Sequence, residues 1–174
     1  IRERHGGTRY AFDWDDLRVI CLGEAPDEGG LASLEADLVS VGKDRPVVIY
    51  LHFALRGPYS TKNWFGDGRY RADLARVLFG YNVVAIFHGH YHASGRYQWE
   101  GIDVYNVGST KHDQWSFGVV RISDTRLSFA SWHWGNYPQW AAPGRGPCGH
   151  GDWGGPPPPH SIPGSPPTGS SYSG

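Results

Sequence analysis

Histidines alternate along the stretch FHGHYHASG (residues 87–95), at His88, His90 and His92. A fourth, His52, follows the apolar run VVIYL earlier in the chain. Imidazole is the commonest side chain that binds transition metals, and in its neutral form it suits Zn, Fe, Mn, Ni or Cu better than Ca or Mg. An isolated histidine is usually a hydrogen-bonded, partly exposed side chain, and His88 fits that description best. The group as a whole predicts a metal site.

Strands and helices alternate along the part of the chain that carries these histidines. Apolar, β-branched runs predict strands, and apolar positions that recur every three or four residues predict helices. The predicted elements are a hairpin over 9–14 and 17–21, a helix over 31–41 that ends near Gly42, a strand over 46–53, a helix over 70–79 that ends at Gly80, and a strand over 82–87. This order is typical of an α/β fold, which binds its ligand at the carboxyl ends of neighbouring parallel strands.

Four further β-like runs follow the histidines. They are Gly95–Trp99, Ile102–Val107, Ser116–Ile122 and Arg126–Trp134, and they predict an antiparallel meander that closes the domain. If the chain leaves the preceding strand in an extended conformation, the side chains of His90 and His92 point to the same side. They would then reach one metal ion or two adjacent ones.

The composition argues against several classes of protein. The net charge is −1 with no basic stripe, so we expect no nucleic-acid partner, and no apolar run reaches the ~18 residues of a membrane helix. Cys21 and Cys148 form no disulfide framework. Residues 141–174 are rich in Pro, Gly and Ser, which predicts a disordered tail after a folded domain over residues 1–140. Because the chain begins at Ile1 and contains no Met, we expect an upstream part to be missing.

The strand-end histidines carry a resemblance to a known family. A strand ending in His52, a helix, and a strand ending in the Gly-His-x-His element of residues 89–92 resemble the last two motifs of the calcineurin-like metallophosphoesterases. The stretch VYNVGST (residues 104–110) is similar to an Asn-x-Gly-Ser turn that often follows in bacterial members. The resemblance covers residues 8–134.

This resemblance implies a fold, an activity and a ligand set. The fold would be the C-terminal half of a four-layer α/β/β/α sandwich, and the activity would be hydrolysis of phosphate mono- or diesters. The cofactors would be two divalent metal ions (Mn, Fe or Zn) that orient the phosphate and activate the attacking hydroxide. Carried over by position, His52 and His90 would bind one metal and His92 the other. Arg56, Tyr59 and Asn63 are candidates for phosphate contact, because their loop would border this site.

The sequence departs from the family in the three earlier motifs, which supply the carboxylate ligands. It contains no Asp-x-His and no Gly-Asn-His, and Gly66-Asp67 stands between the last two motifs, in the wrong chain order. Two divalent ions ~4 Å apart repel by roughly 4 kcal/mol even in bulk water, and neutral imidazoles cannot offset that repulsion. We therefore expect a C-terminal part of such an enzyme that is inactive alone, with the catalytic residues upstream of Ile1.

Two other classes remain open. A mononuclear zinc hydrolase or lyase would use His88, His90 and His92, or two of them plus a distant histidine, around one ion with an open water position. A non-enzymatic binding module would use exposed aromatic side chains as a contact surface; the candidates are Tyr59, Trp64, Tyr97 and Trp99. Core packing and cross-strand pairing explain those aromatics more simply.

Overall fold

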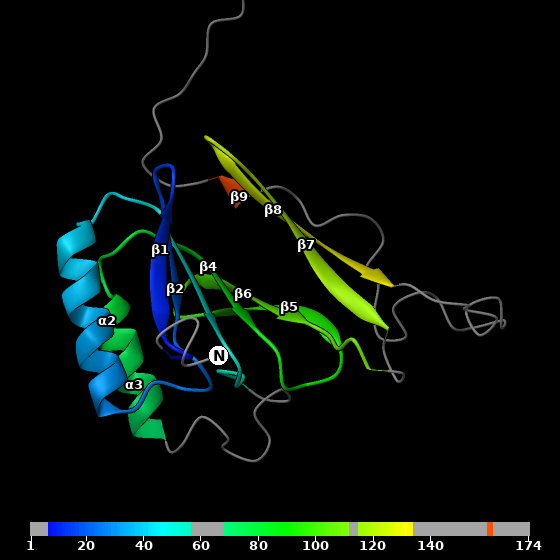
Figure 1. Ribbon diagram of the computed structural model, residues 1–174, viewed down its shortest axis with the longest axis horizontal. Helices are drawn as coiled ribbons and strands as arrows, with labels where there is room; N and C mark the ends of the chain where they lie inside the picture. The colour runs from blue at the N-terminus through cyan, green and yellow to red at the C-terminus, as the bar shows by residue number, and fades with distance from the viewer. Residues whose placement is uncertain (1–6, 57–67, 112–114, 134–159, 162–174) are drawn as a thin grey trace, which may run out of the picture.

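The computed structural model describes residues 7–56, 68–111, 115–133 and 160–161. Within these residues, one sheet has the strand order β1-β2-β3-β4-β6-β5 and a second sheet has the order β7-β8-β9. Helices α2 and α3 cover one face of the first sheet, and the second sheet lies against the other face (Figure 1). The elements are β1 (Tyr10–Trp14), β2 (Leu17–Cys21), α2 (Glu28–Val41), β3 (Val47–Leu51), α3 (Gly68–Leu78), β4 (Val83–His88), β5 (Ser94–Trp99), β6 (Ile102–Val107), β7 (Ser116–Ser123), β8 (Arg126–His133) and β9 (His160–Ser161).

The N-terminal hairpin forms as predicted. Trp14 pairs with Leu17 across the turn, and Asp15 takes a positive φ of 53° in that turn. Aspartate is one of the few residues other than glycine that tolerate this conformation. Arg18 then joins the hairpin to the helix layer, because its guanidinium binds the carboxylates of Asp13 and Asp37.

Helix α2 begins and ends at residues that suit its two ends. The carboxylate of Asp27 accepts a hydrogen bond from the Gly30 amide at 2.7 Å, which satisfies one of the free N–H groups of the first turn. Gly42 ends the helix with φ 85°, and its amide donates to the Leu38 carbonyl at 3.0 Å. Between these ends, the buried face of the helix packs against the sheet through Leu31, Leu34 and Leu38.

Four parallel strands, β2, β3, β4 and β6, form the centre of the first sheet. They are buried on both faces, as their continuous apolar sequences predict. Along β3, Val47 and Ile49 pack toward the helices while Val48 packs toward the second sheet. The predicted α/β fold class is therefore confirmed, in the form of a helix layer and two sheet layers.

The four C-terminal β runs form two antiparallel hairpins, and these divide between the two sheets. The β5–β6 pair belongs to the first sheet, where β6 lies between β5 and β4 and runs parallel to β4. The β7–β8 pair forms the second sheet together with β9. The expected antiparallel neighbours are present, but a single continuous meander is not, because β6 inserts its apolar residues beside the buried strand β4.

The predicted tail over residues 141–174 lies outside the described residues, apart from β9. His160 and Ser161 pair with Leu127 and Arg126 of β8. The division at residue 140 remains a prediction. In the described part of the chain, no helix combines the length and the apolar character needed to cross a membrane.

Candidate functional site

Polar residues gather where β3 and β4 end. The two strands run in parallel register, with Leu51 opposite His88, so the residues that follow them emerge at the same edge of the sheet. The Gly89 amide donates to the His52 carbonyl at 3.2 Å, and the His52 amide donates to the Gly23 carbonyl at 2.9 Å. Backbone hydrogen bonds thus hold together the segments that follow β2, β3 and β4.

His52 and His90 face each other at this edge. Nε2 of His52 lies 3.1 Å from Nδ1 of His90, and the two ring centroids are 5.1 Å apart. Phe53 packs edge-on against the His90 ring, with centroids 4.8 Å apart. The structure therefore brings together the two histidines that were predicted to share one metal ion.

The backbone at His90 is not extended. Its φ is 63°, in the left-handed region that few residues other than glycine adopt. An extended chain after β4, the condition under which His90 and His92 would point to the same side, is therefore not met at His90. The chain instead turns after Gly89, and this turn directs the His90 ring toward His52 rather than along the strand. Backbone conformations of this kind persist where the surrounding contacts hold them, often at functional sites.

Asn106 holds that turn from the end of the neighbouring strand β6. The side chain is fully buried, and its amide nitrogen donates to the carbonyls of Tyr91 (2.8 Å) and Ala93. The sequence analysis placed Asn106 in an Asn-x-Gly-Ser turn without giving it a role. A buried amide at the end of an apolar strand was the available signal, since such a group must find hydrogen-bond partners.

His88 differs from the other histidines because it is buried. Its Nδ1 lies 2.9 Å from the Gly89 carbonyl, which can only accept, so Nδ1 carries the proton. Nε2 lies 3.0 Å from the Tyr97 hydroxyl, which in turn accepts the Leu55 amide at 3.1 Å. Burial, and to a smaller extent the nearby His52 and His90, lower the pKa of His88 to about 4. These contacts give His88 a structural role.

His90 is also biased toward its neutral form. Burial lowers its pKa first, and repulsion from His52 and His92 adds to the effect. A metal binds the neutral imidazole, so this shift favours the form that can act as a ligand. It also indicates that His92, whose side chain is exposed, lies near enough to His90 to influence its charge.

The described residues do not form a complete metal cage. Among them, no group of three or more His, Cys, Asp and Glu side chains is placed to hold an ion. Glu24 is the acidic residue whose backbone joins this edge, because its carbonyl accepts the amides of His52 (3.1 Å) and Phe53 (3.0 Å). Glu24 is not among the predicted site residues, although a polar residue after the apolar run LRVICL is the same signal that indicated His52.

The imidazole pair fits part of a metal site. Two nitrogens that each lie ~2.1 Å from one ion are about 3.0–3.4 Å apart for bond angles between 90° and tetrahedral. The 3.1 Å between His52 and His90 falls in that range. A dinuclear centre does not fit the described donors, because it needs bridging and terminal carboxylates that the chain lacks at the expected motifs.

Only one of the three predicted phosphate-contact residues can be placed. The Arg56 guanidinium donates to the Gln98 carbonyl at 3.0 Å, and Arg56 lines a cavity together with Arg71 and Trp99. Tyr59 and Asn63 lie outside the described residues. A role of these three in binding phosphate stays a prediction.

Comparison with known proteins supports the fold. No protein-family model and no curated protein sequence matches the chain. Among solved structures, a dimetal phosphatase from Danio rerio is similar, with a TM-score of 0.55 and 14% sequence identity over 71% of this chain. The match covers 57% of that phosphatase, so the chain spans less than two thirds of its length. At this level of identity the likeness establishes a shared fold.

Proposed function

We propose that this chain contributes the imidazole ligands of a dinuclear metal centre that hydrolyses phosphate mono- or diesters. The observation that carries the proposal is the meeting of His52 and His90 at the carboxyl edge of β3 and β4, with 3.1 Å between their nitrogens. The likeness to the fold of a dimetal phosphatase supports it. His52 and His90 would hold one ion and His92 would face the second.

The residues of this chain prepare the site rather than perform the reaction. Asn106 and the positive φ of His90 orient the imidazole toward His52, and Phe53 packs against its ring. Burial lowers the pKa of His90, which favours the neutral form that binds metal. When bound, the two ions would orient the phosphate and provide a hydroxide nucleophile at neutral pH. The carboxylates that offset the charge of the ions would have to come from residues outside this sequence.

Calorimetric titration of the 174-residue chain with Zn²⁺ and with Mn²⁺ tests the imidazole half of the site. We expect weak binding of one Zn²⁺ and a similar loss of binding in His52→Ala and His90→Ala, because each variant removes one of two facing ligands. Lys111→Ala, an exposed position, is the control and should bind as the parent chain does. Zinc binding that persists unchanged in both histidine variants would refute the shared site.

Complementation tests the activity. The chain would be joined to the N-terminal part of a structurally similar dimetal phosphatase and assayed with p-nitrophenyl phosphate and bis(p-nitrophenyl) phosphate. Hydrolysis that requires His52 and His90 is the expected result, and the preferred ester distinguishes a monoesterase from a diesterase. A folded, metal-loaded fusion that hydrolyses neither compound would count against the proposal.

The mononuclear zinc alternative uses His88, His90 and His92, or two of them with a distant histidine, and the contacts of His88 weigh against the version that includes His88. Both ring nitrogens are engaged, by the Gly89 carbonyl and the Tyr97 hydroxyl, and the side chain is buried. Tight zinc binding that is lost in His88→Ala but not in His52→Ala would favour that reading instead. Of the aromatic residues proposed as the contact surface of a binding module, Trp99 is buried and Tyr97 bonds His88, whereas Tyr59 and Trp64 lie outside the described residues.

A further inference from the structure

Apolar side chains are exposed between the two sheets beside β7, which is an edge strand among the described residues. In antiparallel strands, residues directly opposite each other share a face. Val120 and Ile122 of β7 are opposite Phe129 and Leu127 of β8, which are buried between the sheets. Yet Val120 is 40% exposed and Ile122 is 36% exposed. Two apolar side chains therefore point into the space between the layers without being covered there.

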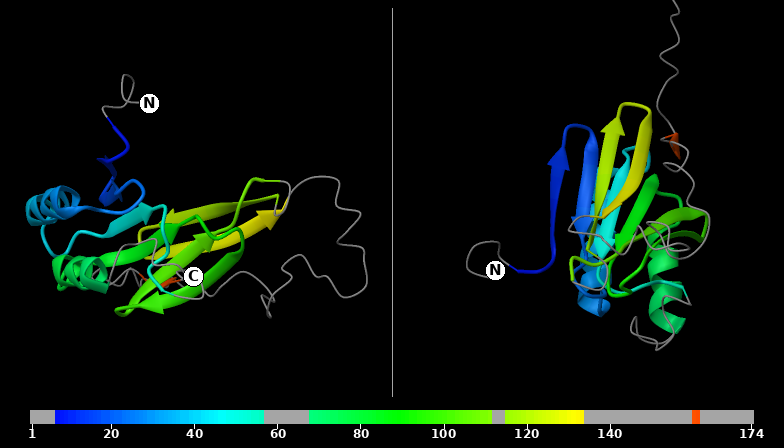
Figure 2. Two further views of the ribbon diagram at one scale, coloured as in Figure 1. Left: turned by 90° about the horizontal axis from the view of Figure 1, so that it is seen from below. Right: turned by 90° about the vertical axis from the view of Figure 1, so that its right-hand side faces the viewer.

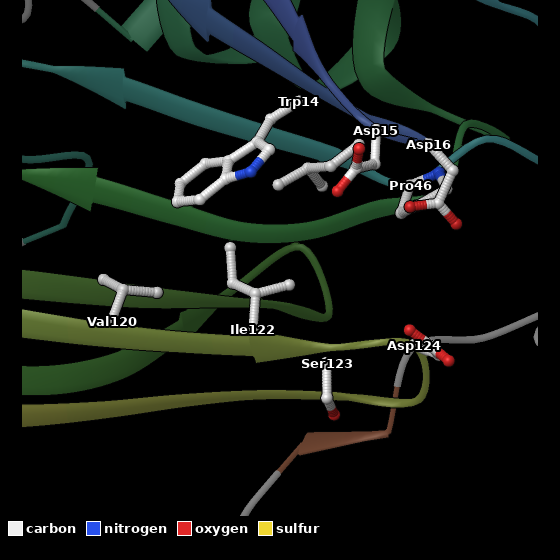
Figure 3. A pocket seen from close by; sticks show the side chains of 9 residues that line it. Trp14, Asp15, Asp16, Pro46, Val120, Ile122, Ser123 and Asp124 are labelled. Carbon is white, nitrogen blue, oxygen red and sulfur yellow. The ribbon is translucent and has the colours of Figure 1, made fainter.

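The opposite wall of this space is β1. Phe12 and Trp14 pair with Val19 and Leu17 of β2, which contribute to the core between the sheets, so all four share that face. Phe12 is nevertheless 43% exposed and Trp14 63% exposed. Figure 3 shows the Trp14 ring facing β7 across a pocket that residues of both sheets line. In Figure 2 the β1–β2 and β7–β8 hairpins stand side by side.

Strand β7 is an unprotected sheet edge in the described part of the chain. It pairs with β8 on one side only, and its sequence SFGVVRIS contains no proline and a single charge, Arg121. Natural edge strands usually carry charges, prolines or a covering segment, because their free N–H and C=O groups accept another strand. An extended peptide adds to such an edge through backbone hydrogen bonds, and its alternate side chains enter pockets on one face.

The pocket is acidic where β7 ends. Asp15, Asp16 and Asp124 line it there (Figure 3). Arg45 lies beside two of them, but it donates to their backbone carbonyls and pairs with the Asp13 carboxylate. A strand that added to β7 in the antiparallel sense would begin at this end. Basic residues at its start would therefore face the carboxylates.

Neither a second copy nor the chain's own tail has this chemistry. If two β7 strands (Ser116–Ser123) paired in full antiparallel register, Asp124 of one copy would face Trp115 of the other and not a cation. The segment 141–174 contains a single Lys or Arg, Arg145, and its described strand β9 pairs with β8, on the other side of the sheet from the edge of β7. The occupant is therefore a strand of different sequence.

We propose that the β1–β7 seam, formed by Phe12, Trp14, Val120, Ile122 and the edge of β7, binds an extended segment of another protein. The segment adds antiparallel to β7, places an apolar side chain at every second position between Trp14 and Val120, and carries basic residues at its N-terminal end. This inference is independent of the phosphoesterase proposal, since none of its residues belongs to the histidine site.

A synthetic peptide tests the seam directly. The probe is Lys-Lys-Val-Thr-Val-Thr-Val-Thr with a fluorescent label, as long as β7. We expect saturable binding by fluorescence anisotropy and slower hydrogen exchange of β7 amides in the complex. The reversed peptide, with its lysines at the other end, should bind about threefold more weakly, in line with the small energies of exposed ion pairs.

Two variants separate the seam from the rest of β7. Val120→Lys puts a charge into the seam and should weaken binding at least about tenfold, because the peptide would bury that charge without a partner. Val119→Lys puts the same charge on the outer face, where Val119 is opposite Ala130, and should bind as the parent chain does.

Four outcomes would overturn the proposal. A scrambled peptide without apolar alternation that binds equally well would show nonspecific adhesion, and absence of binding by the folded chain would show that the seam accepts no strand. Sedimentation that reveals a dimer abolished by Val120→Lys would identify a second copy as the occupant. Slow exchange of the outer β7 amides in the peptide-free monomer would show that the chain itself covers the edge.

Discussion

The two faces of the six-stranded sheet are covered to different extents. One face is covered by α2 and α3, whose side chains Leu34, Leu38 and Leu74 are almost completely buried against it. On the other face, β8 covers the centre with Phe129, while Trp14 at the margin stays exposed. The strands are apolar toward both sides, so the difference lies in the covering layer. The second sheet leaves Phe12 and Trp14 of β1 exposed at the margin of this face.

The strongest test of this comparison removes the side chain of Phe129, which covers the centre of the face that packs against the second sheet. Phe129 is 6% exposed and lies 4.9 Å from the Tyr105 ring and 5.7 Å from the Phe87 ring, measured between centroids. Phe129→Ala should lower the free energy of unfolding by about 3–5 kcal/mol, through lost burial and the cavity left behind. Urea unfolding followed by circular dichroism measures it. A loss below about 1 kcal/mol would mean that the second sheet does not stabilise the first.

A second test probes the carboxyl edge. Asn106→Ala should cost about 1–3 kcal/mol, because two carbonyls of the histidine turn lose a buried donor. Asn82→Ala is a matched control, since the Asn82 side-chain amide donates to the Asp44 carbonyl at 2.9 Å in an exposed position. The control should cost under about 1 kcal/mol by the same measurement. Equal costs for the two variants would show that the turn at Tyr91 and Ala93 does not depend on Asn106.

A third test measures how protein stability depends on pH, which reports the burial of His88 at the carboxyl edge. The folded-state pKa of about 4 lies below the ordinary value of 6.5, so the unfolded chain binds more protons between these two values. Stability from this group is therefore complete above pH 6.5 and is lost as the pH falls toward 4. Between pH 7 and pH 5 the loss should be about 2 kcal/mol. His88→Gln, which does not titrate, should show a smaller difference; an unchanged pH dependence in this variant would contradict the prediction.

The smallest effect is expected at the open margin. Trp14 is large but 63% exposed, so Trp14→Ala should change the free energy of unfolding by less than about 1 kcal/mol. Comparing the losses of unfolding free energy in Trp14→Ala and Phe129→Ala, two aromatic residues on the same side of the six-stranded sheet, tests the difference in cover most directly. A cost at Trp14 similar to that at Phe129 would show that the seam is closed in solution.

Much of the fold could be predicted from local patterns. The boundaries of β2 and β6 agree with the predicted runs, and Gly42 ends α2 as expected. Which strands are neighbours could not be predicted, because pairing depends on contacts between distant segments. Strand β6 illustrates this. Its sequence would suit a strand of a meander equally well, but in the structure it pairs in parallel with β4.

The site was also predictable only in part, because local patterns indicate strand ends but not the contacts between distant segments. The strand-end positions of His52 and His90 indicated that they would meet, and they do. The turn at His90 was not foreseen, because the positive φ falls on a residue other than glycine and the hydrogen bonds to the turn come from Asn106 on another strand. The buried position of His88 follows from its inclusion in β4, one residue beyond the predicted end of the strand.

The chain order of the two sheets has a consequence for biosynthesis. Residues 10–107 contain every described strand of the first sheet, and β7 and β8 come later. Since a ribosome adds about 5–20 residues per second, Phe87 and Tyr105 leave it seconds before Phe129. During that interval their stacked rings, with centroids 5.2 Å apart in the native fold, have no covering sheet. Pauses in translation between β6 and β8 would lengthen that exposure, so the speed of synthesis through this stretch influences how much of the protein escapes aggregation.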